Sequence, residues 1–300
     1  MAKELLITKA NTRFTFDPQA EPVAHADPGD TVRFECMDCY IEQIDCDGKD
    51  FSLIDLHECN PATGPLYVNG AEPGDALKVE ILAIDLADSG AMCVRRGIGS
   101  YEMEGSHCRR FDVRDGVIEF DKGIRVPVKP MIGVIGTAPA DGPISSEDPG
   151  EHGGNMDIRE LGAGTTLYLP VNVPGALLSM GDIHAVMGDG ETAICGLEIN
   201  GTVTVRVSVI KAPHIIPTPF LVTDTACYTT AADLTLDECS IKAARKMHRW
   251  MVSRFDLTEP QAAMLLSLQG NLRISQIVNP HKGCIMEMPR SILEQCAPKK

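Results

Sequence analysis

The segment richest in reactive side chains covers residues 181–191, where three carboxylates and one imidazole alternate with small residues. Glycine adopts backbone angles that other residues avoid, so this segment can fold tightly around an ion or a substrate. Asp182 and His184 are two residues apart and would project from one face of an extended segment. Because imidazole nitrogen and carboxylate oxygen are ordinary zinc ligands, both are candidate metal ligands. A hydrogen-bonded Asp–His pair at a turn is the alternative interpretation.

Two further acids follow in the same segment. Glu191 stands after Gly-Asp-Gly, and a carboxylate held in such a loop is a candidate general base, a metal ligand or a solvent-facing turn residue. Asp189 belongs to an Asp-Gly pair, which is typical of turns, so we interpret it as a turn residue outside the site.

A second Gly-rich polar cluster lies about thirty residues upstream, at residues 152–157, with the sequence HGGNMD. Within it, Asn155 can donate a hydrogen bond to a substrate carbonyl, and Asp157 can bind a metal or a water. A tight turn without function would also use its double glycine. Two such clusters together favour a single active site.

A second Asp-x-His pair, Asp55 and His57, precedes a stiff Pro-rich turn at residues 61–65. This makes His57 a candidate third metal ligand, with a satisfied structural histidine as the alternative. Cys59, two residues further on, is interpreted as chance proximity because the chain has eleven cysteines. The chain has no Gly-x-Ser-x-Gly elbow, no His-Glu-x-x-His helix and no nucleotide-binding glycine motif, which disfavours those chemistries.

Composition limits the partners of this chain. The net charge of its 300 residues is −15, from 42 acidic and 27 basic side chains, and no basic stripe for nucleic acid is visible. The same charge disfavours anionic membranes and favours a neutral or cationic small molecule. An odd number of scattered cysteines indicates reduced thiols in the cytoplasm. The N-terminus lacks a signal-peptide core, and no apolar run is long enough to span a membrane.

Hydrophobic periodicity predicts strands over most of the chain. Valines 203, 205, 207 and 209 alternate with polar residues, as do apolar residues at 77–81 and 32–34. Asp115-Gly116 between apolar pairs predicts a hairpin. The short spacing of turn signals favours a mainly β fold with a β-sandwich or jelly-roll-like core rather than alternating βα units.

The pattern changes near residue 223. Thr235 and Thr258 are predicted helix caps, with Glu238 and Gln261 completing capping boxes. One more strand is expected at 273–278. We therefore expect a β-rich core over residues 1–222 that carries the site, and an α+β portion over 223–300 packed on it.

The order of several motifs resembles the acetamidase/formamidase family. The matching pieces are NPATGP at 60–65, VNGAEPGD at 68–75, HGGNMD at 152–157, LPV with GALL at 169–178, the 181–191 segment, and NLRI with VNP at 271–280. They run in order over nearly the whole chain. Departures from the family pattern stand at Asn69, Met187 and Asn271, and Met187 would alter substrate choice if it lines the pocket.

The resemblance implies a hydrolase of short linear amides with a divalent metal, zinc and also calcium, and a homodimer or larger homo-oligomer. In the mechanism that we expect from this reaction, His57, Asp182 and His184 hold the metal. Glu191 or Asp157 takes the proton of the attacking water and returns it to the amide nitrogen. Asn155 stabilises the oxyanion. Two rival functions are a non-catalytic metal- or ligand-binding jelly-roll protein and a metal hydrolase of esters or ureido groups.

Overall fold

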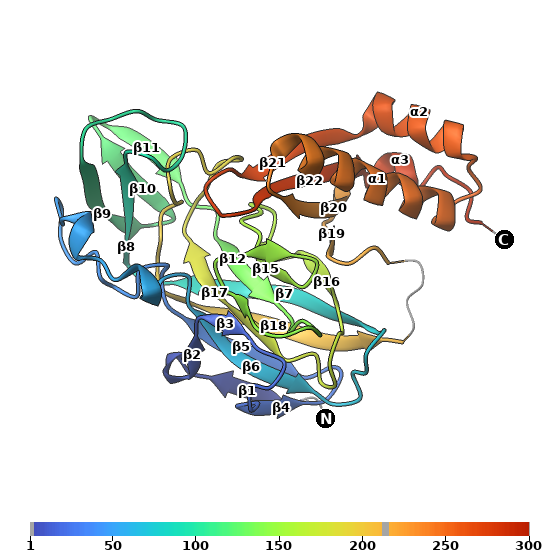
Figure 1. Cartoon of the computed structure of the whole chain (residues 1–300), viewed down its shortest axis with the longest axis horizontal. Coiled ribbons are helices and arrows are strands. Elements are labelled where there is room, and N and C mark those ends of the chain that lie inside the picture. Colours follow the sequence, from blue (N-terminus) through green and yellow to red (C-terminus); the bar gives the residue numbers. More distant parts are fainter. Residues whose placement is uncertain (1–2, 212–215, 300) are drawn as a thin grey trace.

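Two large β-sheets organise the computed structural model, which describes residues 3–211 and 216–299 (Figure 1). The nine-stranded sheet runs in the spatial order β1 (Glu4–Ile7), β5 (Thr31–Cys36), β18 (Gly201–Ile210), β7 (Ala76–Leu86), β16 (Thr166–Pro170), β19 (Phe220–Val222), β20 (Ala226–Asp233), β22 (Lys282–Pro289) and β21 (Asn271–Gln276). The second sheet consists of β14 (Pro149–Gly150), β15 (Gly153–Asn155), β12 (Met131–Gly136), β17 (Leu178–His184), β6 (Ala62–Val68) and β2 (Thr12–Arg13), with β4 (Ala24–Ala26) also on β6. Smaller elements are the pair β3 (Thr15–Phe16) and β13 (Ile144–Ser145), and the 3₁₀ turns η1 (Lys9–Asn11), η2 (Phe51–Leu53) and η3 (Leu56–Glu58).

The two sheets enclose one hydrophobic core. Three of the four alternating valines of β18 are fully buried: Val203, Val205 and Val207. The residues between them are partly buried or exposed, as a half-buried strand requires. The buried valines meet apolar side chains of the facing sheet, among them Leu66, Ile132, Leu178 and Met180. Strands β12 and β17 are buried along their whole length because both of their faces are covered. The expectation of a mainly β, sandwich-like core is confirmed.

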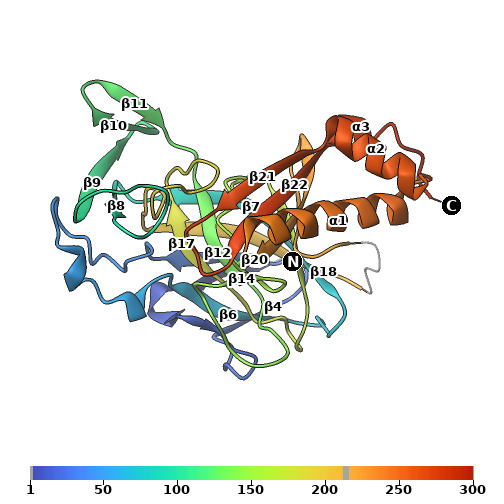
Figure 2. The same ribbon diagram turned by 45° about the horizontal axis from the view of Figure 1, so that its top comes forward.

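A four-stranded arm projects from the sandwich and is formed by β8 (Ser89–Arg95), β9 (Ser106–Arg114), β10 (Val117–Asp121) and β11 (Ile124–Pro127) (Figures 1 and 2). The predicted hairpin is present, since Arg114 pairs with Val117 across Asp115 and Gly116. Both turn residues have positive φ, 51° and 71°, as a type I′ turn demands.

Helices cover the far end of the nine-stranded sheet. They are α1 (Leu236–Arg254), α2 (Glu259–Gln269) and the short α3 (Arg290–Leu293). Thr235 caps α1 by accepting a hydrogen bond from the Glu238 backbone N–H, and Thr258 and Gln261 form the complete capping box of α2. Glu238 contacts the Thr235 hydroxyl instead of the backbone, so only half of the first predicted box forms.

The nine-stranded sheet continues across residue 222. Val222 of β19 pairs with Cys227 of β20, and β20 pairs along its length with β22. The α+β portion is therefore an extension of the same sheet, and its edge strand β21 lies beside the loops of the site described next. No helix among the described residues is long and apolar enough to cross a membrane.

Candidate active site

Four carboxylates and one imidazole converge where β17 ends. Asp182 and His184 belong to β17, and Asp157 follows β15 on the neighbouring strand pair. Glu191 and Glu198 come from the irregular segment after β17. All five side chains are buried, with residue exposures between 1% and 6%. Charged groups are almost never buried to this extent without partners, so this cluster is the strongest functional signal in the molecule.

His184 lies at the centre of the cluster. Its Nε2 is 2.9 Å from Glu198 Oε1, 3.5 Å from Asp182 Oδ1 and 4.0 Å from Glu191 Oε1. Neither ring nitrogen has a well-aligned hydrogen bond, and Asp182 Oδ1 and Glu191 Oε2 are also buried without one. These buried atoms leave their bonding capacity unused, which is costly unless something else binds them.

The backbone is strained at the residues of the cluster. Asp157, Asp182 and Glu191 have φ of 45°, 53° and 45°, and Asn60 beside them has 55°. Residues with a Cβ rarely adopt positive φ, and strain of this kind concentrates at functional sites. Asp182 thus departs from the extended geometry that its sequence spacing assumes, although it still meets His184.

Gly133 of β12 makes room for two of these acids. A Cβ at this position would lie 2.7 Å from Asp157 Oδ1 and 2.8 Å from Asp182 Oδ2. Both distances are below any real carbon contact, so only glycine lets the two carboxylates approach this strand.

Three asparagine amides hold the acids in place. Asn279, after β21, donates to Asp157 Oδ2 at 2.7 Å, and Asn60 donates to Asp182 Oδ2 at 3.2 Å. With the Asn155 amide assigned the orientation that satisfies both of its ends, its nitrogen donates to Asp157 Oδ2 at 2.7 Å and its oxygen accepts from Asn60 at 3.0 Å. Asn155 is therefore engaged with protein groups at both ends of its amide, so the structure shows it as a partner of Asp157.

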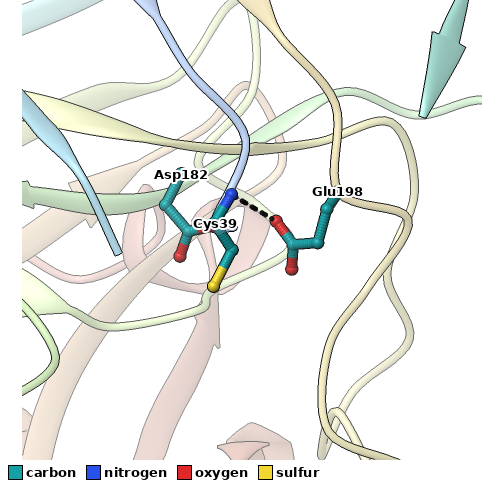
Figure 3. Close-up of side chains that lie close together, drawn as sticks. All are labelled: Cys39, Asp182 and Glu198. Atoms are coloured by element: carbon teal, nitrogen blue, oxygen red, sulfur yellow. Dashed lines mark hydrogen bonds between the residues drawn. The ribbon is translucent and has the colours of Figure 1, made fainter. Parts of the chain in front are cut away.

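A thiol also reaches the cluster. Figure 3 shows Cys39 beside Asp182 and Glu198, and the Cys39 backbone N–H donates to Glu198 Oε2 at 3.3 Å. One ligand atom from each of these three residues lies within 4.8 Å of the others. The same holds for Asp157, His184 and Glu191, so two potential donor triads share this small volume.

The site opens into a cavity of about 200 Å³. Acids, asparagines and apolar side chains line it: Cys39, Tyr40, Phe51, Leu56, Cys59, Asn60, Ile98, Glu147, Asn155, Asp157, Asp182, Glu191, Ile194, Glu198, Val278, Asn279 and Pro280. This volume is below that of pockets for drug-sized ligands, so only a small molecule fits. Met187 instead lines a neighbouring, more apolar cavity of about 310 Å³, which shares Glu191 with the first. The other two departures from the family pattern line neither cavity: Asn69 donates a hydrogen bond to Asp27, and Asn271 donates one to Glu287.

Burial and mutual repulsion shift the protonation of the acids. Burial, followed by the Asp182 charge, raises the pKa of Asp157 to about 6. Burial raises the pKa values of Glu191 and Glu198 well above the ordinary value. Burial opposes the charged form of His184, but Glu198 and Asp182 outweigh it and raise the His184 pKa well above its usual range. Burial also opposes ionisation of Asp182, yet His184 lowers its pKa overall.

The donor set fits a divalent metal ion. Donors bound at about 2.1 Å in a tetrahedron lie about 3.4 Å apart, close to the separations around His184 Nε2. Imidazole and carboxylate suit zinc, and the surplus of oxygen donors also suits a harder ion such as calcium. The buried donor atoms without hydrogen bonds are those that an ion would bind.

His57 is not part of this cluster, which corrects the expectation from the sequence. It is exposed on η3, and its backbone N–H donates to Asp55 Oδ1 at 2.9 Å. The Asp-x-His pattern at 55–57 is therefore a cap of a 3₁₀ turn, because the aspartate side chain satisfies the turn instead of a metal. Among the described residues, neither donor triad includes His57.

Sequence reasoning missed Glu198, Cys39, Asn60 and Asn279 as site residues. Glu198 lies between the buried Leu197 and Ile199, and a charge inside an apolar run is the signal that could have identified it. The asparagines stand in two of the family-like motifs, but nothing in their spacing indicates a contact with Asp157 or Asp182.

The sequence and the fold correspond to those of a known family. The sequence profile of the Acetamidase/Formamidase family matches residues 3–148 and 141–295, so the chain belongs to this family. The chain is 43% identical to an acetamidase from Bacillus halodurans of known crystal structure, with a TM-score of 0.94. The superposition covers 97% of this chain and 99% of the Bacillus chain. The acetamidase from Yersinia enterocolitica is 27% identical with a TM-score of 0.92, covering 97% and 93%.

Curated relatives match over a shorter part of the chain. The formamidase of Methylophilus methylotrophus is 27% identical, and the acetamidase of Mycolicibacterium smegmatis is 28% identical, each over 65% of this chain. The matches span 63% and 64% of these two relatives, so this chain covers less than two thirds of their length.

Proposed function

We propose that this protein is a metal-dependent amidase that hydrolyses a short linear amide to a carboxylate and ammonia. Membership of the acetamidase/formamidase family supports the reaction, and relatives are named for formamide and acetamide. The small cavity supports a substrate of few atoms. The observation that carries the metal is the set of four buried carboxylates around one imidazole.

That set cannot be fully ionised by itself. Asp157, Asp182, Glu191 and Glu198 carry four formal negative charges, and His184 supplies at most one positive charge. At short distances in a dry site, this repulsion far exceeds what the protein could offset. A divalent cation offsets two of these charges and also binds unused donor atoms.

We assign Asp182, His184 and Glu198 as the residues that hold the metal, with Glu198 in the place expected for His57. Their atoms approach most closely, at 2.9 Å and 3.5 Å around His184 Nε2. When bound, a divalent ion supplies Lewis acidity, which lowers the pKa of water and polarises a carbonyl.

Asp157 and Glu191 act as the proton-transfer pair. Each is buried, and burial followed by the charge of Asp157 raises the pKa of Glu191, so the two acids titrate as a pair that shares protons. One carboxylate accepts the proton of the attacking water and returns it to the amide nitrogen, because ammonia leaves only when that nitrogen is protonated. A pKa of about 6 for Asp157 suits this exchange near neutral pH.

Asn155 orients Asp157 in this scheme. Its amide nitrogen donates to the acid, and its oxygen is held by Asn60 and Asn279.

An ammonia-release assay across formamide, acetamide, propionamide and simple esters tests this function. Ammonia from a short amide together with about one equivalent of bound metal supports the proposal. Bound metal without turnover of any amide would favour a binding protein, and turnover of esters alone would favour an esterase. We also propose that the protein is a cytoplasmic homo-oligomer without nucleic-acid or membrane partners. Sedimentation of the purified protein tests its oligomeric state.

A further inference from the structure

Arg273 on β21 connects the two loops that carry the proton-transfer acids. Its Nη2 donates to Glu160 Oε1 at 2.7 Å, and Glu160 stands three residues after Asp157. Its Nε and Nη2 bind Asp189 as a bidentate pair, both at 2.8 Å, and Asp189 stands two residues before Glu191. The remaining nitrogen donates to Glu287 of β22 at 2.6 Å, a contact that lies outside both loops.

The strand that carries Arg273 supports both loops through further bonds. Gly190 N–H donates to Ser275 O at 2.9 Å, and Ile277 N–H donates to Gly190 O at 3.1 Å, so the 188–190 turn pairs with the end of β21. On the other side, the buried Ser275 hydroxyl donates to Met156 O at 3.0 Å. Each loop is therefore tied to β21 at a residue adjacent to one of the catalytic acids.

These contacts hold two loops whose backbone is strained at the acids. Asp157 and Glu191 both adopt strained backbone conformations, with φ of 45° at each residue. Strain of this kind persists only where the surrounding structure holds the backbone in place. A planar guanidinium with five fixed donors bridges two carboxylates at a defined spacing, which a lysine cannot reproduce.

We propose that Arg273 is a positioning residue that sets the separation of Asp157 and Glu191 by holding Asp189 and Glu160. It does not touch the substrate cavity. The inference rests on the proposed function for its effect on turnover, whereas its effect on the two loops is independent of that function. Asp189, which we interpreted from the sequence as a turn residue outside the site, thereby helps to position the acids.

The test compares three principal variants of the 300-residue chain, and a fourth, Arg273→Ala, serves for chemical rescue. Arg273→Met removes the bridge, Asp189→Asn weakens one arm of it, and Glu287→Gln is the matched control that removes an Arg273 partner outside both loops. We expect Arg273→Met to lower kcat for acetamide or formamide by on the order of 10²-fold, with KM changed less than about threefold. Asp189→Asn should lower kcat by about tenfold, and Glu287→Gln by less than about threefold. Millimolar guanidinium should restore part of the activity of Arg273→Ala.

Hydrogen–deuterium exchange supplies the readout that needs no activity. Arg273→Met should accelerate exchange in residues 156–161 and in residues 188–191 together, while Glu287→Gln leaves both unchanged. If the wild-type protein releases no ammonia from any amide, the proposed function fails, and exchange alone decides the role of Arg273. Unchanged exchange in both segments, or equal losses of kcat in the Arg273 and Glu287 variants, would overturn the inference. If Arg273→Met fails to fold, Asp189→Asn and Glu160→Gln are measured in the same way.

Discussion

His184 Nε2 lies 2.9 Å from Glu198 Oε1, although the two residues come from different segments and each side chain is only 1% exposed. The contact is not an aligned hydrogen bond, because the ring nitrogen still lacks a partner in the required direction. Two donors that approach so closely without bonding each other support the proposal that both are ligands of a shared ion.

Glu198→Gln should weaken metal binding. The substitution keeps the shape of the side chain but removes one anionic donor, so we expect at least about a tenfold loss of zinc affinity and a matching loss of kcat. Competition with a chromogenic chelator measures the affinity. Unchanged affinity would remove Glu198 from the ligand set.

His57→Ala should leave the protein nearly unaffected. The imidazole is exposed, and the contact of this residue with Asp55 uses its backbone N–H, which alanine retains. Zinc affinity and kcat should stay within about twofold of the wild type, as for ordinary surface positions. A large loss of bound metal would reinstate the ligand role that the sequence suggested.

Gly133→Ala should damage the site without unfolding the sandwich. The added methyl group would displace Asp157 and Asp182, both under 3 Å from it, and we expect kcat to fall on the order of 10²-fold. Gly188→Ala is the matched control, since a Cβ there meets nothing within 4 Å and φ is not positive. Equal activity of the two variants would contradict the packing argument.

His152 predicts a pH dependence of stability. Burial lowers the pKa of this histidine from 6.5 to about 4. The unfolded chain therefore takes up a proton at a higher pH than the folded protein does, so stability falls as the pH drops through this window. The difference amounts to about 3 kcal/mol at pH 4.

Urea unfolding of the wild type and His152→Gln between pH 7 and pH 4 measures this contribution. The variant should lose less stability across the window, by about the same amount. His107→Gln, at an exposed position of β9, should keep the wild-type slope. A His152→Gln slope equal to that of the wild type would refute the assignment.

Local patterns in the sequence were sufficient for much of the fold. The alternating valines of β18, the Asp115-Gly116 turn and the threonine caps of both helices depend on neighbours within a few residues, and the structure confirms them. The continuation of one sheet from β19 to β21 depends on pairing between distant strands. No short-range pattern encodes that register, so it was not predictable.

The site also contains contacts that local sequence patterns predict and contacts that depend on distant pairing. Asp182 and His184 are near neighbours on one strand, and their contact followed from the spacing. Glu198 and Asn279 reach the cluster through tertiary pairing, and among 42 acids no local feature distinguishes Glu198 strongly. His57 was misplaced because the pattern Asp-x-His serves turn capping as readily as metal binding.

Ammonia release by metal-free protein is the most direct test of the central claim. The protein is treated with a chelator, freed of metal as checked by elemental analysis, and assayed with formamide and acetamide before and after zinc is added back. The account predicts no ammonia release above background from the metal-free protein and recovery with about one equivalent of metal per chain. Full turnover in protein verified to be free of metal would contradict it.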